Sequence, residues 1–310
     1  MQGMLRASRR LKELGILGMN RRNAAYILDY NPRANFPVVD DKLRMRDLCR
    51  RIGVPSPGIY AEISLHSMLG RLPEILADKN DFVIKPNRGS AGRGVLVVLA
   101  RTAAGYVRHN GEALTVEQLR QHLSDILSGM YSLAGRPDCA LVQQRVRLHA
   151  DFAPVSYKGI PDIRVIVYRN QPAMAMLRLP TRASNGRANL HQGGIGVGVE
   201  LESGCTGHAV QHNRVVRSHP DTGASLLGLS VPHWQGVVDM SRQVAEAVGL
   251  GYIGVDIVVD EIQGPMLLET NARPGLAIQI ANNQGLVPRL KAIDRRTNNP
   301  ETPAHSSLIK

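Results

Sequence analysis

The stretch GYIGVDIVVDEIQGPMLLETNARPG, from Gly251 to Gly275, decides the fold of this 310-residue chain. Two short apolar segments, residues 252–259 and 265–270, flank the polar sequence at 260–264. Short apolar runs separated by a polar turn that contains glycine are typical of a β-hairpin. The sequence therefore predicts two antiparallel strands here.

The predicted hairpin brings two acidic residues together. If its turn centres between Ile262 and Gln263, Asp256 lies directly opposite Glu269, and Asn271 follows on the same face. Opposed carboxylates destabilise a sheet unless one is protonated or a cation lies between them. Two acids and an amide oxygen, without Cys or His, form a ligand set that favours Mg²⁺, Mn²⁺ or Ca²⁺ over zinc. The alternative is that these side chains are solvated on the open face of the hairpin.

Composition and length bound the class of protein. A chain of this length supports a sizeable core and roughly two domains. Hydrophobic residues make up 43% of it, and no stretch reaches the roughly 18 consecutive apolar residues of a membrane span. Three widely spaced cysteines, an odd number, indicate reduced thiols and a cytoplasmic location.

The net charge of +12 and the pI near 10.0 point to an anionic partner, for which a nucleic acid, an anionic substrate and a membrane surface are the candidates. Part of the charge lies in residues 5–17, a basic amphipathic stretch that predicts a helix. The twelve aromatic residues (three Phe, eight Tyr and one Trp) are few for a nucleic-acid surface, where bases stack on aromatic side chains. Charge alone therefore does not identify the partner.

A helix is predicted from Asp41 to Ile52, with Asp40 or Asp41 as its N-cap and Gly53 as its stop. Lys42 lies in the first turn, where a cation opposes the helix dipole. This placement suggests that Lys42 faces an anion, although a solvated lysine is the commoner case.

Residues 82–98, FVIKPNRGSAGRGVLVV, carry the second motif. Two apolar strands are predicted on either side of a glycine-rich loop at 89–94. Small residues there let backbone N–H groups close over an anion, and Lys85, Arg88 and Arg93 add positive charge. The loop is not a P-loop, because no Gly-Lys-Ser/Thr and no helix pattern follow it. A flexible hairpin tip is the alternative interpretation.

The rest of the chain supplies connecting elements. The clearest helix is predicted at 115–130, and a strand at 140–146 leads into a polar hinge at 147–161. Beyond the hinge, the polar loop at 180–194 is too long for a tight turn and carries arginine, asparagine and histidine, which favours a binding loop.

Taken together, the motifs resemble those of ATP-grasp ligases, most closely the alpha-L-glutamate ligase-like (RimK-related) branch. The resemblance covers about residues 38 to 292, and the motifs that carry it occur in the family's order: Asp41-Lys42, the lysine strand and glycine flap at 85–94, Asp162-Ile163-Arg164, the loop at 187–194, the Asp256 strand and Glu269-x-Asn271-x-x-Pro274-Gly275.

The resemblance implies an α+β ATP-grasp fold, in which two α+β subdomains with antiparallel sheets sandwich ATP. The expected organisation is a short helical segment at 1–60 in place of a full N-terminal domain, a small subdomain at 61–150, a large subdomain at 151–294 and a disordered tail at 295–310. Part of the usual substrate wall is then missing, so a second copy or a partner protein is expected to complete it.

The resemblance also implies roles for individual residues. ATP is expected to contact Lys42, Lys85, the flap residues Gly89, Ser90, Gly92 and Gly94, and Gln144, Val146 and Asn189. Two Mg²⁺ ions, with Mn²⁺ as an alternative, are expected on Asp256, Glu269 and Asn271. Arg164, Arg178 and Arg273 are expected to face the acyl group or the transferred phosphate.

One departure from the family pattern concerns the ribose. Related ligases usually have an acidic residue where this chain has Gln143-Gln144, so His149 or Asp151 is a candidate to replace it.

The implied activity is ATP-dependent ligation of a carboxylate to an amine, such as an amino acid or peptide, through an acyl phosphate. Its physical requirements are positioning and neutralisation of charge, which need no dedicated nucleophile. A phosphotransferase or nucleotide-binding scaffold on the same fold is the first alternative. A basic nucleic-acid-binding protein is the second.

Overall fold

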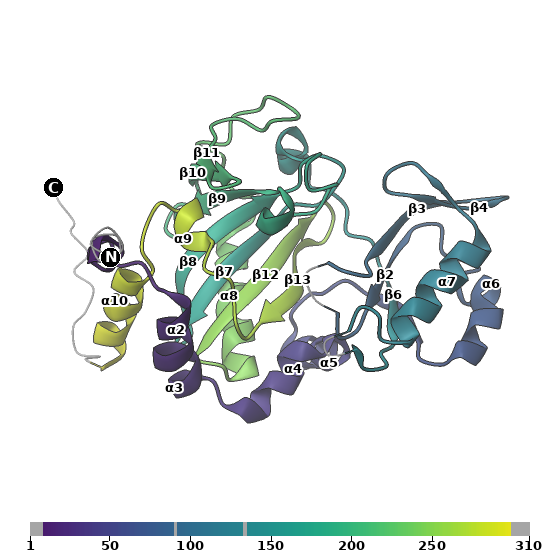
Figure 1. Cartoon of the computed structure of the whole chain (residues 1–310), viewed down its shortest axis with the longest axis horizontal. Helices are drawn as coiled ribbons and strands as arrows, with labels where there is room; N and C mark the ends of the chain where they lie inside the picture. Colours follow the sequence, from purple (N-terminus) through teal and green to yellow (C-terminus); the bar gives the residue numbers. More distant parts are fainter. Residues whose placement is uncertain (1–8, 90–91, 133–134, 299–310) are drawn as a thin grey trace, which may run out of the picture.

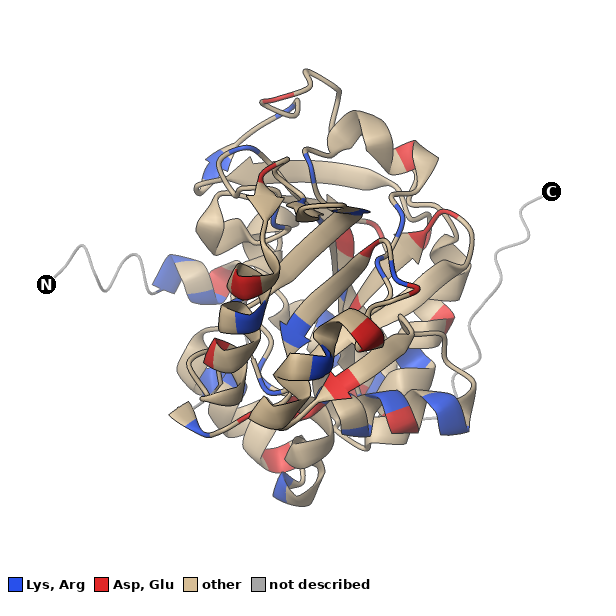
Figure 2. Ribbon diagram, turned by 90° about the vertical axis from the view of Figure 1, so that its right-hand side faces the viewer, with Lys and Arg blue, Asp and Glu red and all other residues tan. Residues whose placement is uncertain are grey.

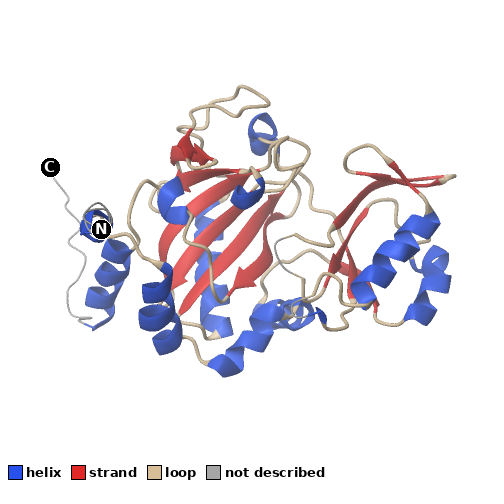
Figure 3. Cartoon of the chain, in the orientation of Figure 1, coloured by secondary structure: helices blue, strands red, loops and turns tan. Residues whose placement is uncertain are grey.

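The computed structural model describes residues 9–89, 92–132 and 135–298. In these ranges the chain forms two antiparallel sheets, each with its own helices, which lie side by side as a small and a large subdomain (Figures 1 and 3). The expected α+β architecture of two antiparallel sheets is confirmed. No helix in the described ranges is long and apolar enough to cross a membrane.

The small subdomain is a six-stranded sheet covered by helices on one face. In spatial order its strands are β1 (Ile59–Ile63), β6 (Ala140–Gln143), β2 (Phe82–Pro86), β3 (Leu96–Thr102), β4 (Gly105–Arg108) and β5 (Ala113–Leu114). The 3-10 helix η3 (His66–Arg71) and the helices α6 (Leu72–Ile75) and α7 (Val116–Leu127) cover it. Alternate residues of β2 are buried, as expected for a strand with one covered face. The predicted capping box, between Thr115 and Gln118, starts α7.

The large subdomain is a seven-stranded sheet with helices on both faces. Its order is β11 (Arg214–Val215), β10 (Thr206–Gln211), β9 (Ile195–Val199), β8 (Gln171–Leu179), β7 (Asp162–Tyr168), β12 (Tyr252–Asp260) and β13 (Gly264–Asn271). Helix α8 (Trp234–Val248) covers one face, and α9 (Ile278–Ala281) and α10 (Val287–Asn298) cover the other. Every residue of β12 is buried as a result, which explains why this strand is an almost unbroken apolar run. Short 3-10 helices, η5 (Ala150–Val155) and η6 (Leu190–Gln192), lie in the hinge and the polar loop.

The N-terminal segment belongs to the large subdomain. After a helical turn at 9–13, it runs through α2 (Met19–Arg22), the π-helical turn η1 (Asn23–Ile27), α3 (Leu28–Tyr30), the 3-10 turn η2 (Arg33–Asn35), α4 (Phe36–Asp40) and α5 (Lys42–Ile52). Asn31 fixes it to the start of β12, because its side chain donates to the Tyr252 carbonyl and accepts from the Tyr252 N–H, both at 2.8 Å. Residues 5–8 of the predicted first helix lie outside the described ranges.

Two boundaries differ from expectation. β1 begins at Ile59, inside the segment expected to end at residue 60, because it pairs with β6. The tail expected to be disordered from residue 295 is still helical to Asn298. Asp294 accepts hydrogen bonds from Tyr168 at 2.8 Å and from Arg169 at 3.1 Å, and Arg169 also donates to Asn298 at 3.0 Å. Residues 299–310 lie outside the described ranges.

The β12–β13 hairpin has the predicted pairing of Asp256 with Glu269. The observed turn is centred on Ile262, half a residue before the predicted centre, since Asp260 pairs with Gly264 around a three-residue loop. A bulge at Leu268 then shifts the register by one residue, and this shift restores the predicted pair.

Candidate functional site

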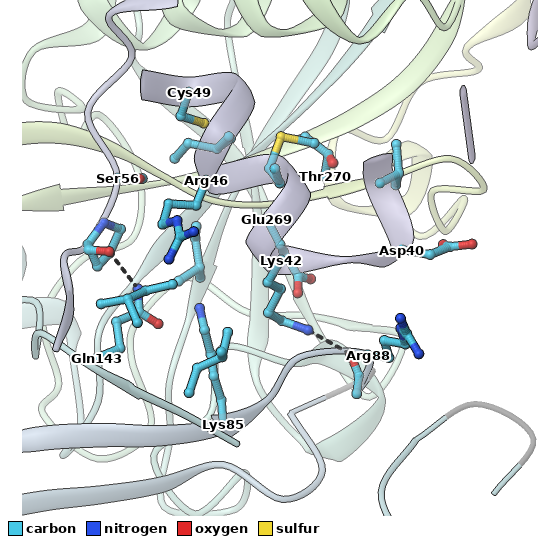
Figure 4. A pocket seen from close by; sticks show the side chains of 18 of the residues that line it. Asp40, Lys42, Arg46, Cys49, Ser56, Lys85, Arg88, Gln143, Glu269 and Thr270 are labelled. Atoms are coloured by element: carbon cyan, nitrogen blue, oxygen red, sulfur yellow. Dashed lines mark hydrogen bonds between the residues drawn. The ribbon is translucent and has the colours of Figure 1, made fainter. Parts of the chain in front are cut away.

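A pocket lies where the small sheet meets the edge strand of the large sheet. Helix α5, the end of α4 and the segment before β1 form one side, β2 and β6 form another, and β13 closes the third. Among the residues that line it are Lys42, Arg46, Lys85, Arg88, Gly89, Gln143, Glu269 and Asn271, together with the apolar side chains of Val39, Met45, Ile59, Leu141 and Leu268. Figure 4 shows Gln143 and Ser56 on one side of the pocket and Asp40, Lys42 and Arg88 on the other.

Lys42 connects α5 to the glycine-rich loop. Asp41 caps the helix by accepting from the N–H groups of Leu43 and Arg44, both at 3.1 Å, so the predicted cap is confirmed. The Lys42 ammonium donates to the carbonyl of Asn87 at 3.0 Å and to that of Gly89 at 2.9 Å, and Figure 4 shows the second of these bonds. Burial lowers the pKa of Lys42, and the nearby Glu269 carboxylate opposes this effect.

Lys85 projects from β2 into the same pocket (Figure 4). Burial and the positive charge of Lys42 lower the pKa of Lys85 to about 7. Two amines and the Glu269 carboxylate therefore meet in a pocket that Arg46, Arg88 and Asp40 also line, and the excess of positive charge suits an anionic ligand.

Asp256 is fully buried and lies behind Glu269. Its carboxylate accepts from Arg164 Nε at 2.7 Å and Nη2 at 2.5 Å, from Arg178 Nη2 at 2.8 Å and from the Asn271 amide at 3.2 Å. Burial raises the pKa of Asp256, but the two guanidinium charges outweigh burial and hold the pKa well below its usual range. Arg178 also pairs with buried Asp162, so the sheet contains a chain of alternating charges.

The donor set at this end of the pocket fits a hard divalent cation. The Glu269 carboxylate and the Asn271 side chain line the pocket, and Asp256 lies within hydrogen-bonding reach of Glu269. Asn271 donates its N–H to Asp256, which leaves its amide oxygen as a possible ligand. No group of three or more His, Cys, Asp or Glu side chains suited to a metal ion occurs in the described ranges, so the amide is needed to complete the set.

Several residues predicted to contact the nucleotide do not line the pocket. Gln144 pairs with Gly58 through its backbone and its side chain, and Val146 packs against Val258 and Met266 in a small apolar cluster. The predicted hinge pair therefore lies outside the residues that line the pocket. The residue that lines it is Gln143, whose amide donates to the Pro57 carbonyl at 3.3 Å.

Asn189 and Arg273 also lie outside this lining. Asn189 caps η6 by accepting from the His191 N–H at 3.0 Å, and Arg273 stacks on Phe36 with 4.9 Å between guanidinium carbon and ring centre. His149 and Asp151, the ribose candidates, lie in the hinge, where the His149 side chain caps η5 by accepting from the Asp151 N–H at 3.2 Å, and neither lines the pocket. Of the flap, Gly89 lines the pocket, Gly92 and Gly94 have left-handed backbone conformations, and Ser90 lies outside the described ranges.

Sequence reasoning missed Arg46 as a pocket residue. It lies on α5 one helical turn after Lys42, and four residues is the spacing that places two helical side chains on the same face. Its guanidinium donates to Asp47 Oδ1 at 2.8 and 3.0 Å and projects toward Lys85 and Gln143 (Figure 4). The i, i+4 spacing was a usable signal, but Arg46 is one of several arginines on this helix.

A comparison with protein-family models identifies the family. Residues 21–295 match the model described as sugar-transfer associated ATP-grasp. The chain belongs to this ATP-grasp family. The match covers both subdomains and the N-terminal helices that pack on them, so the ATP-grasp assignment made from the sequence motifs is confirmed at the level of the superfamily. A comparison with curated proteins found no match.

Solved structures of similar fold are ATP-grasp enzymes of low sequence identity. D-alanyl-alanine synthetase A from Vibrio cholerae has a TM-score of 0.50 and 12% identity, over 84% of this chain and 64% of that one. The ATP-grasp ligase PsnB in complex with its minimal precursor, Mg and ADP has a TM-score of 0.48 and 17% identity, over 87% and 62%. A RimK domain ATP-grasp protein from Sphaerobacter thermophilus has a TM-score of 0.47 and 13% identity, over 85% and 70%. The chain thus spans less than two thirds of the length of the first two.

Proposed function

We propose that this protein is an ATP-dependent ligase that joins a carboxylate to an amine through an acyl phosphate. The observation that carries the proposal is the convergence of Lys42 and Lys85 with Glu269 and Asn271 in one pocket between the two sheets. The membership of an ATP-grasp family supports it.

In the proposed reaction, Lys42 and Lys85 bind the triphosphate and the glycine-rich loop from Gly89 covers it. The Lys42 ammonium already donates to the carbonyls of Asn87 and Gly89, just before and at the start of this loop. Phosphate binding by Lys42 and the position of the loop are therefore linked. The apolar side chains of Ile59, Leu141 and Leu268, with the Gln143 amide, offer a surface for the base. Closure excludes water, which protects an acyl phosphate from hydrolysis.

The chemistry needs two steps. A carboxylate oxygen of the substrate takes the γ-phosphoryl group, releasing ADP, and an amine then attacks the acyl carbon, loses a proton and releases phosphate. Magnesium, held by Glu269 and Asn271, would neutralise charge on the phosphates. Arg164 and Arg178 were expected to face the acyl group, but neither lines the pocket and both donate to Asp256. Their proposed role is to hold Asp256 ionised, so that Asp256 can orient the Asn271 amide that donates to it.

Hydroxylamine trapping tests the reaction class directly. With ATP, magnesium and a panel of carboxylates, a ligase yields ADP and an acyl hydroxamate, whereas a phosphotransferase or scaffold yields no hydroxamate. Because the family description concerns sugar transfer, the panel includes uronic acids beside amino acids and short peptides. The amines, tested afterwards, include amino sugars and amino acids.

The matched variants are Glu269→Gln and Glu261→Gln. Both lie on the same hairpin, but Glu269 lines the pocket and Glu261 is an exposed turn residue. Loss of hydroxamate and ADP in Glu269→Gln, with wild-type yields in Glu261→Gln, is the expected result. Equal yields from all three proteins would overturn the assignment of the site.

A further inference from the structure

One end of the large subdomain combines positive charge with exposed apolar side chains. The end surface, as we call it, is made by the first part of the N-terminal segment, residues 9–21, and by α10, and it lies at the end of the molecule away from α6 and α7 of the small subdomain (Figure 1). Its exposed residues are Arg9, Arg10, Leu11, Lys12, Leu14, Met19, Arg21, Lys291, Arg295 and Arg296.

The apolar part of the end surface is concentrated in one short segment. Leu11 and Leu14 are each 50% exposed and Met19 is 64% exposed. Single exposed leucines are ordinary, but three large apolar side chains in nine residues, with Lys12 among them and Arg9, Arg10 and Arg21 on either side, form a patch.

This segment is held firmly on the body of the protein. The Val287 N–H, at the start of α10, donates to the Gly15 carbonyl at 3.1 Å, and the Leu17 N–H donates to the buried Gln279 amide at 2.8 Å. A Cβ at Gly15 would lie 2.6 Å from Pro288 Cδ, so the N-terminal segment and α10 are in close contact at this point. The exposed leucines are therefore presented by a fixed platform.

Two acids at the end surface, Glu13 and Asp294, are already paired. Asp294 accepts from Tyr168 and Arg169, which lie on the inner side of α10. Glu13 pairs with Arg9 at 3.3 Å and with Arg10 at 3.7 Å. Lys291, Arg295 and Arg296 project outward and contribute net positive charge that the fold does not use.

We propose that the end surface binds the face of an anionic lipid bilayer. Basic side chains are attracted to anionic headgroups, and aliphatic side chains between them enter the interface. A nucleic acid fits less well, because its phosphates offer nothing to Leu11, Leu14 or Met19, and the large exposed apolar residues here are aliphatic rather than stacking aromatics. The end surface lies on the side of the large subdomain away from the small subdomain (Figure 1), whereas the pocket is lined by residues of both subdomains, so binding at this end does not block it.

Vesicle co-sedimentation of the full chain tests the proposal. The probe vesicles contain equal parts of phosphatidylcholine and phosphatidylglycerol, and pure phosphatidylcholine vesicles are the reference. The expected result is sedimentation with the anionic vesicles only, weakened but not abolished by raised salt, since the aliphatic contacts are insensitive to screening.

Two variants test separately the basic side chains and the aliphatic side chains of the end surface. Each basic residue near an anionic surface contributes roughly fivefold to binding, so the triple variant Lys291→Gln/Arg295→Gln/Arg296→Gln is expected to bind on the order of 100-fold more weakly. The variant Leu11→Gln/Leu14→Gln is expected to lose binding by at least about tenfold. The control, Arg50→Gln/Arg51→Gln/Arg217→Gln, removes the same charge from exposed residues outside the end surface and is expected to bind like wild type.

The outcomes that overturn the proposal are distinct. Equal loss in the control and the triple variant would mean that net charge alone matters. Binding to duplex DNA without binding to anionic vesicles would identify a nucleic-acid surface. A concentration-dependent dimer that the Leu11→Gln/Leu14→Gln variant abolishes, without vesicle binding, would make the end surface an interface between two copies.

Discussion

Asp256 and Glu269 lie directly opposite each other across β12 and β13, but their surroundings differ completely. Asp256 is fully buried and neutralised by Arg164 and Arg178, whereas Glu269 lines the pocket beside Lys42. The two opposed carboxylates are tolerated because one of them is already paired with cations. Asp256 therefore supports the fold as well as the site, and Glu269 mainly serves the site.

The first prediction concerns stability. Asp256→Asn leaves the guanidinium of Arg164 without its buried anion and Arg178 with Asp162 alone, so we expect a loss of about 3–5 kcal/mol in the free energy of unfolding. Glu269→Gln, at a half-buried position, is expected to change it by less than about 1 kcal/mol. Urea denaturation followed by circular dichroism measures both. Similar values for the two variants would contradict the distinction.

The second prediction concerns nucleotide affinity. Lys42→Met removes a cation that binds the carbonyls of Asn87 and Gly89, so it weakens both phosphate binding and the position of the loop. A loss of about 1.5–3 kcal/mol, or roughly 10- to 150-fold in the Kd for an ATP analogue, is expected. Isothermal titration calorimetry measures the Kd. Lys79→Met, at a lysine on the small subdomain outside the pocket lining, is the control and should leave it unchanged.

The third prediction concerns pH. Because burial and Lys42 lower the pKa of Lys85 to about 7, a fraction of Lys85 is neutral at pH 7.5 in the free protein. A bound triphosphate raises this pKa, so binding takes up a proton. Lys85 therefore favours the complex fully below pH 7, and its contribution falls as pH rises from 7 through the pKa of the complex.

Calorimetry in buffers of different ionisation enthalpy measures this proton uptake at pH 7.5. Wild type is expected to take up more protons than Lys85→Met, which retains only the contribution of the nucleotide. Identical uptake by the two proteins would show that Lys85 stays fully charged or does not meet the nucleotide.

The fourth prediction concerns the N-terminal segment. Asn31→Ala removes two buried hydrogen bonds to the backbone of Tyr252 and leaves those backbone groups unpaired, so we expect a loss of about 2–4 kcal/mol in stability. Asn20→Ala, at an exposed position on the same segment, is the control. Thermal unfolding measures both. An unchanged Tm for Asn31→Ala would mean that the segment is not part of the large subdomain's folding unit.

The sequence predicted best those features that depend on residues close together in the chain. The α5 cap at Asp41 and the α7 capping box follow from residues three positions apart, and both are confirmed. The pairing of Asp256 with Glu269 was predicted from a turn centre that was wrong by half a residue, and the bulge at Leu268 compensated. A bulge depends on packing across the sheet, which a single strand sequence does not encode.

The features that the sequence did not predict depend on contacts between residues far apart in the chain. The tail was expected to be disordered from residue 295, but the helix Val287–Asn298 continues past this point, because its last turn is stabilised by Arg169, more than a hundred residues earlier. Gln143 and Gln144 are neighbours of the same type, and only the contacts with Pro57 and Gly58 determine which one lines the pocket. The pairing of Arg164 and Arg178 with Asp256 likewise depends on three strands meeting in register.

The most direct test of the central claim is a crystal structure with a non-hydrolysable ATP analogue and Mn²⁺, with anomalous data collected near the manganese edge. The account predicts the triphosphate between Lys42 and Lys85 on one side and β13 on the other, with an anomalous peak beside Glu269 and Asn271. A nucleotide bound elsewhere, or a fully occupied nucleotide without manganese at these residues, would contradict it.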